Sequence, residues 1–313
     1  MDLSDKIGRR LKLQDLNVLV TVAQAGSMGK AAQRLNTTQP AVSRTISELE
    51  TALGVRLLDR SRHGVEPTTY GRALLHCAAA VFDDLRQGIK NIEFLSDPTF
   101  GEIRIGGDET VIGGLVSTVL ARLRSRYRGV TIHITHIGSL SDQYRELRDR
   151  KIDLVLGQVP STIDVEDDIE AQVLYEDRIV VAAGLQSRWS NRRKIELDEL
   201  VDEAWALPAA DTVADSLVQQ AFRARKINVR GAATGSPHLL LSLMARGPFL
   251  AAIPDSMLRF ETNLPPLKVL PLELSIPGWP VGAMMLKHRT MSPVAELFLD
   301  SAREAVQTIL HKK

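Results

Sequence analysis

Three polar residues in the stretch TTQPAVSRTISELE, namely Gln39, Ser43 and Ser47, are spaced four residues apart. Residues at this spacing share one face of a helix, and Pro40 and Arg44 lie beside that face. Gln pairs bidentately with adenine, Arg pairs with guanine, and Ser bonds to bases or phosphates. An ordinary solvated helix face is the alternative for each residue alone, but the combination favours the reading of double-stranded DNA.

A helix that reads DNA needs a second helix packed closely across it. We expect a first helix over Leu13–Ala25 that ends at Gly26, and a second over Met28–Leu35 with Ser27 as its N-cap. The buried stripe of the first helix is predicted to be Leu13, Leu16, Val20 and Ala23. The second helix offers a small-residue packing face, consisting of Ala31, Ala32 and Leu35.

The third helix would carry the polar face. Thr38 can cap it, and Pro40 falls in its first turn, where a missing N–H costs nothing. Leu53 and Gly54 end it. Its predicted buried residues are Ala41, Val42, Ile46 and Leu49. The order of elements is that of a helix-turn-helix whose second helix reads bases.

A basic hairpin follows the third helix. Val55–Leu58 and Val65–Glu66 are predicted as short strands around DRSRHG, with Gly64 at the turn. Such a wing would place Arg60, Arg62 and His63 against the phosphates or the minor groove.

A long helix is predicted from Thr69 to about Phe94. Its apolar residues recur at helical intervals: Leu74, Leu75, Ala78, Val81, Phe82, Leu85, Ile89, Ile92 and Leu95. Since nothing in its own domain would cover this stripe, we expect it to pack on a second copy of the chain. Two copies bring two reading helices to a roughly two-fold DNA site.

The run AA-x-x-L-x-x-TQPAVSR-x-I-x-x-LE-x-x-LGV-x-LL-x-R, together with the Gly-containing wing, resembles the DNA-binding end of a LysR-type transcriptional regulator. Family members often have Arg where His63 stands, which leaves the strength or pH dependence of that wing contact open. The segments from Gly64 to Thr99 look most similar to regulators grouped with those of sugar-binding-protein and aromatic-catabolism genes. Taken with the resemblance, the predicted DNA-binding residues are Ser27, Thr38, Gln39, Pro40, Ser43, Arg44, Arg62 and His63.

The resemblance also implies partners and an assembly. It implies a homo-dimer or a homo-tetramer built as a dimer of dimers, which contacts two or more half-sites and bends the DNA between them. It further implies RNA polymerase as a partner, activation of a nearby operon and repression of the regulator's own gene.

Charge and composition agree with a regulator of this kind. Residues 1–75 hold eleven Lys and Arg against seven Asp and Glu, a net charge of +4 in a chain whose total is +1. The one cysteine, Cys77, excludes an intramolecular disulfide, and we interpret it as a small buried hydrophobe. No apolar run approaches the roughly 18 residues of a membrane span. We therefore expect a cytoplasmic protein with no membrane partner.

The rest of the chain alternates strands with helices, which predicts parallel sheets. The first unit comprises strands at 101–107, 130–137 and 152–158 and helices at 110–127 and 139–151; the second comprises strands at 178–184, 204–208 and 249–254 and helices at 213–226 and 237–246. A return crossing at 281–289 and a helix at 292–310 would come back to the first unit. Two α/β lobes joined by two crossings form a hinged cleft, and the LysR family's effector domain has this plan.

The predicted fold class is therefore α plus α/β. It consists of a winged helix-turn-helix at 11–68, a dimerising linker helix at 69–97 and an effector-binding domain at 101–310 of the periplasmic-binding-protein-like type 2 plan. Lobe I would span about 101–159 and 282–310, and lobe II about 160–281.

Ligands of open α/β sheets lie beyond the carboxyl ends of the strands, often at helix N-termini. The residues at those positions are Glu109, Thr110, Ser139, Gln158, Asp211, Thr212 and Ser236. Each also suits a helix cap or a turn. Helix starts favour an anionic effector, whereas Glu109 and Asp211 argue against a simple dicarboxylate.

No enzyme motif is present: the sequence has no G-x-S-x-G elbow, no P-loop and no G-x-G-x-x-G. His133 and His136 would point to opposite faces of a strand, so neither a metal site nor any cofactor beyond a small-molecule effector is predicted. The prediction is a ligand-responsive DNA-binding regulator and not an enzyme. Two alternatives stay open, a small-molecule binding protein that reads no DNA and a DNA-binding protein that needs no effector.

Overall fold

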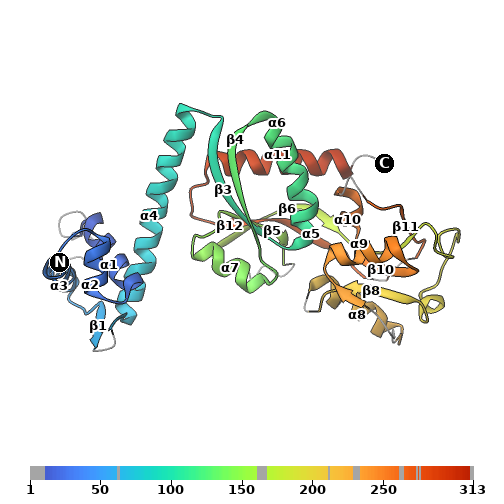
Figure 1. Cartoon of the computed structure of the whole chain (residues 1–313), viewed down its shortest axis with the longest axis horizontal. Helices are drawn as coiled ribbons and strands as arrows, with labels where there is room; N and C mark the ends of the chain where they lie inside the picture. The colour runs from blue at the N-terminus through green and yellow to red at the C-terminus, as the bar shows by residue number, and fades with distance from the viewer. Residues whose placement is uncertain are drawn as a thin grey trace. The chain divides into compact units, whose positions relative to one another are not determined.

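The computed structural model describes residues 11–61, 64–160, 168–210, 212–227, 233–260, 264–272, 274 and 276–310. The chain divides into two compact units, Met1–Gly88 and Ile89–Lys313. Helices α1 to α3 and a two-stranded sheet lie in the first unit, and two five-stranded sheets lie in the second (Figure 1). None of the described helices is both long enough and apolar enough to cross a bilayer.

The helix-turn-helix is present as predicted. Its helices are α1 (Leu13–Ala25), α2 (Met28–Arg34) and α3 (Gln39–Leu53). Gly26 and Gly54 follow α1 and α3 with φ of 62° and 73°, a left-handed conformation that glycine adopts without strain. Thr38 caps α3 through its Oγ1, which accepts a hydrogen bond from the Ala41 amide at 3.4 Å. Local signals in the sequence were therefore enough to set the ends of these helices.

The buried face of α1 differs from the prediction. Val18, Leu19 and Val22 form it, whereas Leu13 is 47% exposed. Apolar residues occupy more than one face of α1, so periodicity alone could not select the buried one. The buried face is the one that packs with small Ala31 of α2 in the core of this unit. On α3 the predicted residues Val42, Ile46 and Leu49 are buried, but Ala41 is exposed.

The wing is a hairpin of β1 (Leu58–Ser61) and β2 (Gly64–Pro67). The first strand begins three residues later than predicted, because the preceding backbone is held by a side chain. Glu50 Oε1 accepts hydrogen bonds from the amides of Leu57 and Leu58 at 2.8 and 3.2 Å. Two of the predicted wing residues, Arg62 and His63, lie outside the described residues.

Gly64 is required by close packing as well as by its conformation. Its φ is 137°, and a Cβ there would lie 2.8 Å from the carbonyl oxygen of Gly26. The next amide, that of Val65, donates to the same carbonyl at 2.9 Å. The wing is therefore joined to the end of α1.

Helix α4 (Thr69–Ser96) carries the predicted apolar stripe. Leu74 and Leu75 pack on the core of the first unit. Farther along, Leu85, Ile89, Ile92 and Leu95 are 47–80% exposed. Cys77 is also exposed, which contradicts the expectation that it is buried. The reason is that Cys77 lies on the side of α4 that the first unit leaves uncovered.

The first large sheet has the strand order β4-β3-β5-β12-β6. Its strands are β3 (Phe100–Gly107), β4 (Gly129–His136), β5 (Leu154–Gln158), β6 (Ile169–Asp177) and β12 (Trp279–Leu286). Strand β3 is parallel to β4 and β5, as the alternating pattern predicts, and β12 runs antiparallel to β5 and β6. The helices that accompany it are α5 (Glu109–Val111), continued by a π-helical turn (Ile112–Val116) into α6 (Ser117–Arg126), then α7 (Leu140–Arg148) and α11 (Pro293–Leu310).

The second large sheet has the order β11-β7-β10-β8-β9. Its strands are β7 (Ile179–Gly184), β8 (Ala204–Pro208), β9 (Ala233–Gly235), β10 (Phe249–Pro254) and β11 (Leu267–Val269). The helices are a 3-10 turn (Leu197–Leu200), α8 (Val213–Ala224), α9 (Pro237–Arg246) and α10 (Asp255–Phe260).

The predicted boundaries of the lobes were wrong in one respect. Residues 169–177 were placed in lobe II with no strand predicted, but they form β6, which pairs with β12 and so belongs to the sheet of lobe I. The chain therefore crosses to lobe II at Arg178, between β6 and β7, and returns between β11 and β12. The final helix α11 packs on α6, β3 and β6 of lobe I, as predicted.

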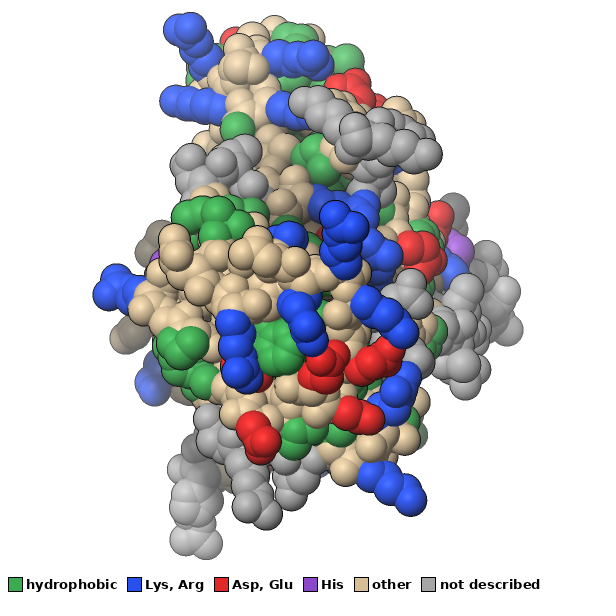
Figure 2. All heavy atoms as spheres, turned by 90° about the vertical axis from the view of Figure 1, so that its right-hand side faces the viewer, with side chains coloured by type: hydrophobic (Ala, Val, Ile, Leu, Met, Phe, Trp, Pro, Cys, Tyr) green, Lys and Arg blue, Asp and Glu red, His purple; other side chains and the backbone are tan. Residues whose placement is uncertain are grey.

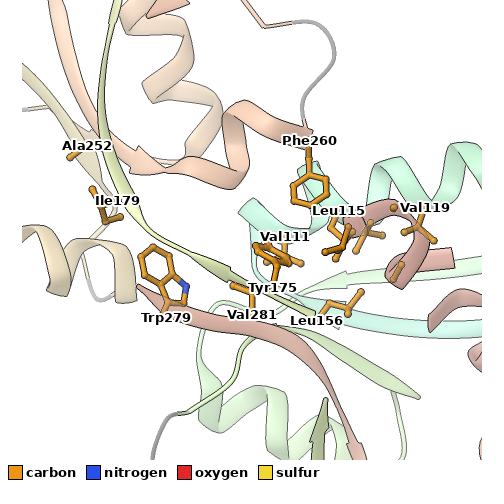
Figure 3. Close-up of a cluster of buried hydrophobic side chains, with 14 of the residues drawn as sticks. Val111, Leu115, Val119, Leu156, Tyr175, Ile179, Ala252, Phe260, Trp279 and Val281 are labelled. Carbon is orange, nitrogen blue, oxygen red and sulfur yellow. The ribbon is translucent and has the colours of Figure 1, made fainter. Parts of the chain in front are cut away.

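The two lobes share one hydrophobic core at these crossings (Figure 3). Tyr175 of β6 and Phe260 of α10 pack with ring centroids 5.5 Å apart. Trp279, at the start of β12, is also buried in this cluster. The lobes are thus joined by packed side chains as well as by the two backbone crossings.

The surface in Figure 2 carries Lys and Arg side chains next to Asp and Glu, with hydrophobic side chains in small separate groups. Ion pairs on lobe II follow this pattern: Arg192 pairs with Glu199 at 2.8 Å, and Lys194 pairs with Glu196 at 2.8 Å. Basic residues that are paired in this way do not form a continuous positive surface for DNA.

Candidate nucleic-acid interface and ligand cavity

The predicted reading face of α3 is open to solvent. Thr38, Gln39, Pro40 and Arg44 are exposed, and Ser43 is half-buried. The exposure follows from the helical spacing, because Val42, Ile46 and Leu49 turn the opposite face into the core. The N-terminal half of α3 therefore presents hydrogen-bonding side chains outward, as base reading requires.

Ser43 is oriented by the wing. Arg60 of β1 donates from Nη1 to Ser43 Oγ at 3.1 Å. The Ser43 hydroxyl then retains its own proton to donate to a base or a phosphate. Ser47 differs, because its hydroxyl donates to the Ser43 carbonyl at 2.9 Å. The sequence placed Arg60 on the wing but gave no sign that it contacts α3.

Arg44 is held only loosely. Its Nε lies 3.8 Å from Glu48 Oε1, and the two side chains are 82% and 71% exposed. An exposed pair at this helical spacing contributes about 0.3–0.5 kcal/mol. Arg44 is therefore free to exchange Glu48 for a base or a phosphate.

Ser27 and Gln39 both lie beside Gly29, near the starts of α2 and α3. Ser27 occupies the N-cap position of α2, but its hydroxyl makes no capping hydrogen bond. A Cβ on Gly29 would lie 3.9 Å from Ser27 Oγ and 3.4 Å from Gln39 Oε1. Both polar groups therefore lie next to Gly29, which has no side chain to displace them.

The second site is a cavity of about 390 Å³ between lobes I and II. Five of the predicted effector-binding residues line it: Glu109, Thr110, Gln158, Thr212 and Ser236. Ser139 is not among the lining residues; its hydroxyl caps α7, accepting from the Asp142 amide at 3.1 Å and donating to Asp142 Oδ2 at 2.7 Å. Asp211 lies outside the described residues.

Four polar residues of the lining were not predicted: Asp108, His136, Gln143 and Asp177. Asp108 directly follows β3, so the rule on strand ends could have found it. Gln143 lies within α7, one turn beyond the predicted Ser139. Asp177 ends β6, a strand that was not predicted and whose residues were assigned to lobe II.

Burial raises the pKa of the Asp108 carboxyl above its ordinary value. The amides of Val111 and Thr110 and the nearby His136 oppose that shift, and Asp177 adds to it. Burial also raises the pKa of Asp177, against hydrogen bonds from Ser256 and the Arg178 amide. Two carboxyl groups with raised pKa values therefore face one cavity.

Asp177 also belongs to the crossing between the lobes. Its Oδ1 accepts from the amides of Arg178 and Ser256 at 2.8 and 3.1 Å, and its Oδ2 accepts from Ser256 Oγ at 2.6 Å. Arg178 Nε donates in turn to Asp255 at 3.1 Å. A ligand that contacts Asp177 is thus linked directly to the residues where the chain changes lobe.

Much of the remaining lining is apolar, including Leu140, Leu240, Met257, Trp279 and Val281. A concave, mostly apolar site with a few convergent polar groups is typical of small-molecule sites. Among the described residues no cluster of three or more His, Cys, Asp or Glu could hold a metal ion. His136 lines the cavity, while His133 lies 3.9 Å from Glu102 on β3.

Two family models match the chain. One, a bacterial regulatory helix-turn-helix protein of the lysR family, covers residues 13–72. The other, the LysR substrate binding domain, covers residues 96–307. The first match favours the DNA-reading interpretation over a binding protein without DNA.

Whole-length relatives give the same result. The HTH-type transcriptional regulator GbpR of Azospirillum brasilense is 24% identical over 97% of this chain and 89% of its own length. PcaQ of Agrobacterium fabrum, also an HTH-type transcriptional regulator, is 26% identical over 96% of both chains. Since differently named regulators match about equally well, no subgroup stands out.

Solved structures share the fold. A full-length OxyR of Pseudomonas aeruginosa, solved as a cysteine-to-aspartate variant, superposes with a TM-score of 0.63 at 20% identity, covering 94% of this chain and 95% of that one. Full-length CbnR, solved in complex with its target DNA, gives 0.57 at 20% identity, covering 94% and 100%.

Proposed function

The chain belongs to the LysR family of DNA-binding transcriptional regulators, and on that premise we propose which of its residues read DNA and which bind the effector. The proposed DNA-reading residues are Gln39, Ser43 and Arg44 on α3, with Ser27, Thr38 and Pro40 beside them. Arg60 supports them, and Arg62 and His63 are proposed as the wing contacts. The effector-binding residues are those that line the interlobe cavity.

The observation that carries the DNA proposal is the open face of α3. Gln39 and Arg44 are exposed near the start of the helix, where side chains reach base edges. Arg44 has a weak partner in Glu48, and Ser43 retains a donor because Arg60 supplies the hydrogen bond that it accepts. Each group is therefore available without breaking the core.

The cavity supports a response to a small molecule. It lies between two lobes that are joined at Arg178, and Asp177 contributes both to its lining and to that crossing. A ligand shifts an arrangement of the lobes only by its difference in affinity for the two states. We propose that the cavity serves recognition and not turnover, and that the protein acts in the cytoplasm, where the DNA is.

Self-association follows from α4. Leu85, Ile89, Ile92 and Leu95 form an exposed apolar face whose solvation is unfavourable. We propose that two copies cover this face, giving a homo-dimer that can pair again into a tetramer.

The test is fluorescence anisotropy of the full chain with the duplex just upstream of its own gene, against a scrambled duplex, at two salt concentrations. Selective binding that weakens steeply with salt is expected, because phosphate contacts release counterions. Equal affinity for both duplexes at every salt concentration would contradict the proposal that α3 recognises the base sequence upstream of the gene.

A further inference from the structure

The lining of the effector cavity is acidic. Asp108, Glu109 and Asp177 bring three carboxyl groups, and His136 is the single residue of the described lining with a basic side chain. No Lys or Arg is among these lining residues. A carboxylate or phosphate ligand would therefore meet like charges with no fixed cation to balance them.

Gly157 has no side chain beside two acceptor oxygens that belong to lining residues of the cavity. A Cβ on Gly157 would lie 3.4 Å from Asp108 Oδ2, 3.6 Å from Gln143 Oε1 and 3.7 Å from Gln143 Nε2. The orientation of the Gln143 amide is fixed, because its Nε2 donates to the Ile137 carbonyl at 2.8 Å and the side chain is only 4% exposed. Asp108 is fixed as well, since its Oδ1 accepts from the Val111 amide at 3.0 Å. Each of the two oxygens is thus held in place as a hydrogen-bond acceptor.

The N-termini of the helices around the cavity do not make it favour an anionic ligand over a hydrogen-bond donor. The helices α5, α7 and α8 are capped by their own side chains, those of Asp108, Ser139 and Thr212. Ser236 makes no capping hydrogen bond at the start of α9. A helix start carries roughly half a positive charge, which is smaller than the charge of the carboxylates. The backbone amides at the uncapped start of α9 can still donate to a carbonyl at the far end of a ligand.

We propose that the effector is a cationic amphipathic small molecule whose ammonium group donates to Asp108 Oδ2 and Gln143 Oε1. Its apolar body packs on Leu240, Met257 and Trp279, which line the same cavity. The cavity volume of about 390 Å³ suits a compound with one ring or a short chain. This inference rests on the proposed function of the cavity as the effector site.

The test compares matched probes that share a body and differ in the head group. Benzylamine, benzyl alcohol and benzoate form one set, and hexylamine, hexanol and hexanoate form another. Their dissociation constants for the full chain are measured by ligand-observed NMR titration. We expect each amine to bind about tenfold or more tightly than its carboxylate, the difference that one charge-assisted hydrogen bond produces.

Two variants locate the effect at the proposed point. Asp108→Asn keeps an oxygen for the Val111 amide, so it retains the cap while it loses the charge. Gly157→Ala adds a methyl group beside the two oxygens, at ordinary contact distances of 3.4–3.7 Å from them and from Gln143 Nε2, and so narrows the space through which an ammonium group would reach them. Both variants should weaken amine binding about tenfold and leave alcohol binding within about twofold. The control Asp300→Asn, an exposed change on α11, should alter neither.

Amines that bind no better than carboxylates, or an amine affinity that Asp108→Asn leaves unchanged, would overturn the inference. Failure of all six probes to bind would overturn it too and would also count against the cavity as the effector site. The DNA-reading proposal is judged separately, by anisotropy without ligand.

Discussion

Replacing Glu50 should lower the stability of the first unit and leave that of the second unchanged. Its Oε1 holds the amides of Leu57 and Leu58, which join α3 to the wing. A hydrogen bond to a charged acceptor contributes about 1.5–3 kcal/mol. Because both bonds share one oxygen and the site is only half-buried, we expect Glu50→Ala to lower the free energy of unfolding of the first unit by about 2–3 kcal/mol.

The assay uses the positions of the tryptophans. Trp189, Trp205 and Trp279 are the only Trp residues of the chain, and all lie in the second unit. Fluorescence therefore reports unfolding of the effector domain, while far-UV circular dichroism also reports the helices of the first unit. A loss of 2–3 kcal/mol in a domain of this size lowers its melting midpoint by roughly 10–20 °C. The dichroism transition should move by that amount while the fluorescence transition stays in place.

Glu48→Ala is the matched control, since it removes the same side chain from an exposed position of the same helix. It should change stability by no more than about 0.5 kcal/mol. Glu50→Gln should fall between the two, because the amide oxygen still accepts both hydrogen bonds without charge. A Glu50→Ala midpoint equal to that of Glu48→Ala would refute the role of Glu50, and so would equal shifts in both transitions.

Three further changes test other parts of the structure. Gly64→Ala should destabilise the first unit by about 1–3 kcal/mol, because its Cβ would lie 2.8 Å from the Gly26 carbonyl at a φ of 137°; a dichroism melt checks this, and an unchanged midpoint would contradict it. Ile92→Glu should weaken self-association through the exposed face of α4, giving a smaller mass by light scattering, whereas an unchanged mass would show that this face is not the interface. Burial raises the pKa of Asp108 above 3.8, so the folded domain retains a proton that the unfolded chain releases. The stability that Asp108 contributes should therefore be present at low pH and lost as pH rises through the raised pKa. Fluorescence melts across that pH range should show the wild-type midpoint declining relative to Asp108→Asn, with His136 and Asp177 as the neighbouring titrating groups; parallel curves would count against it.

The helix-turn-helix could be predicted because its signals are local. Thr38 and Gly54 mark the ends of α3 within a few residues of the positions that they control, and the caps form as expected. The start of the wing could not be predicted in the same way. A hydrogen-bonding Glu50 side chain replaces a strand ladder at Leu57, and apolar periodicity carries no information about that.

The lining residues of the cavity that follow the ends of strands could be predicted from the sequence. Thr110 and Gln158 line it because they come after β3 and at the end of β5, as the rule for open sheets requires. Asp177 was missed because β6 joins lobe I only by pairing with β12, a strand far along the chain. Ser139 was predicted at the same kind of position, but it caps α7 and is not among the lining residues.

The central claim is that α3 reads base pairs, and one measurement tests it most directly. Binding free energies are measured for every single base-pair variant of the operator, with the wild-type chain and with Arg44→Ala. The account predicts that Arg44→Ala loses about 1–3 kcal/mol on the operator and loses discrimination at one base pair of each half-site, with the other positions unchanged. Uniform weakening on every sequence would show that Arg44 contacts only phosphate, and this result would contradict base reading by Arg44.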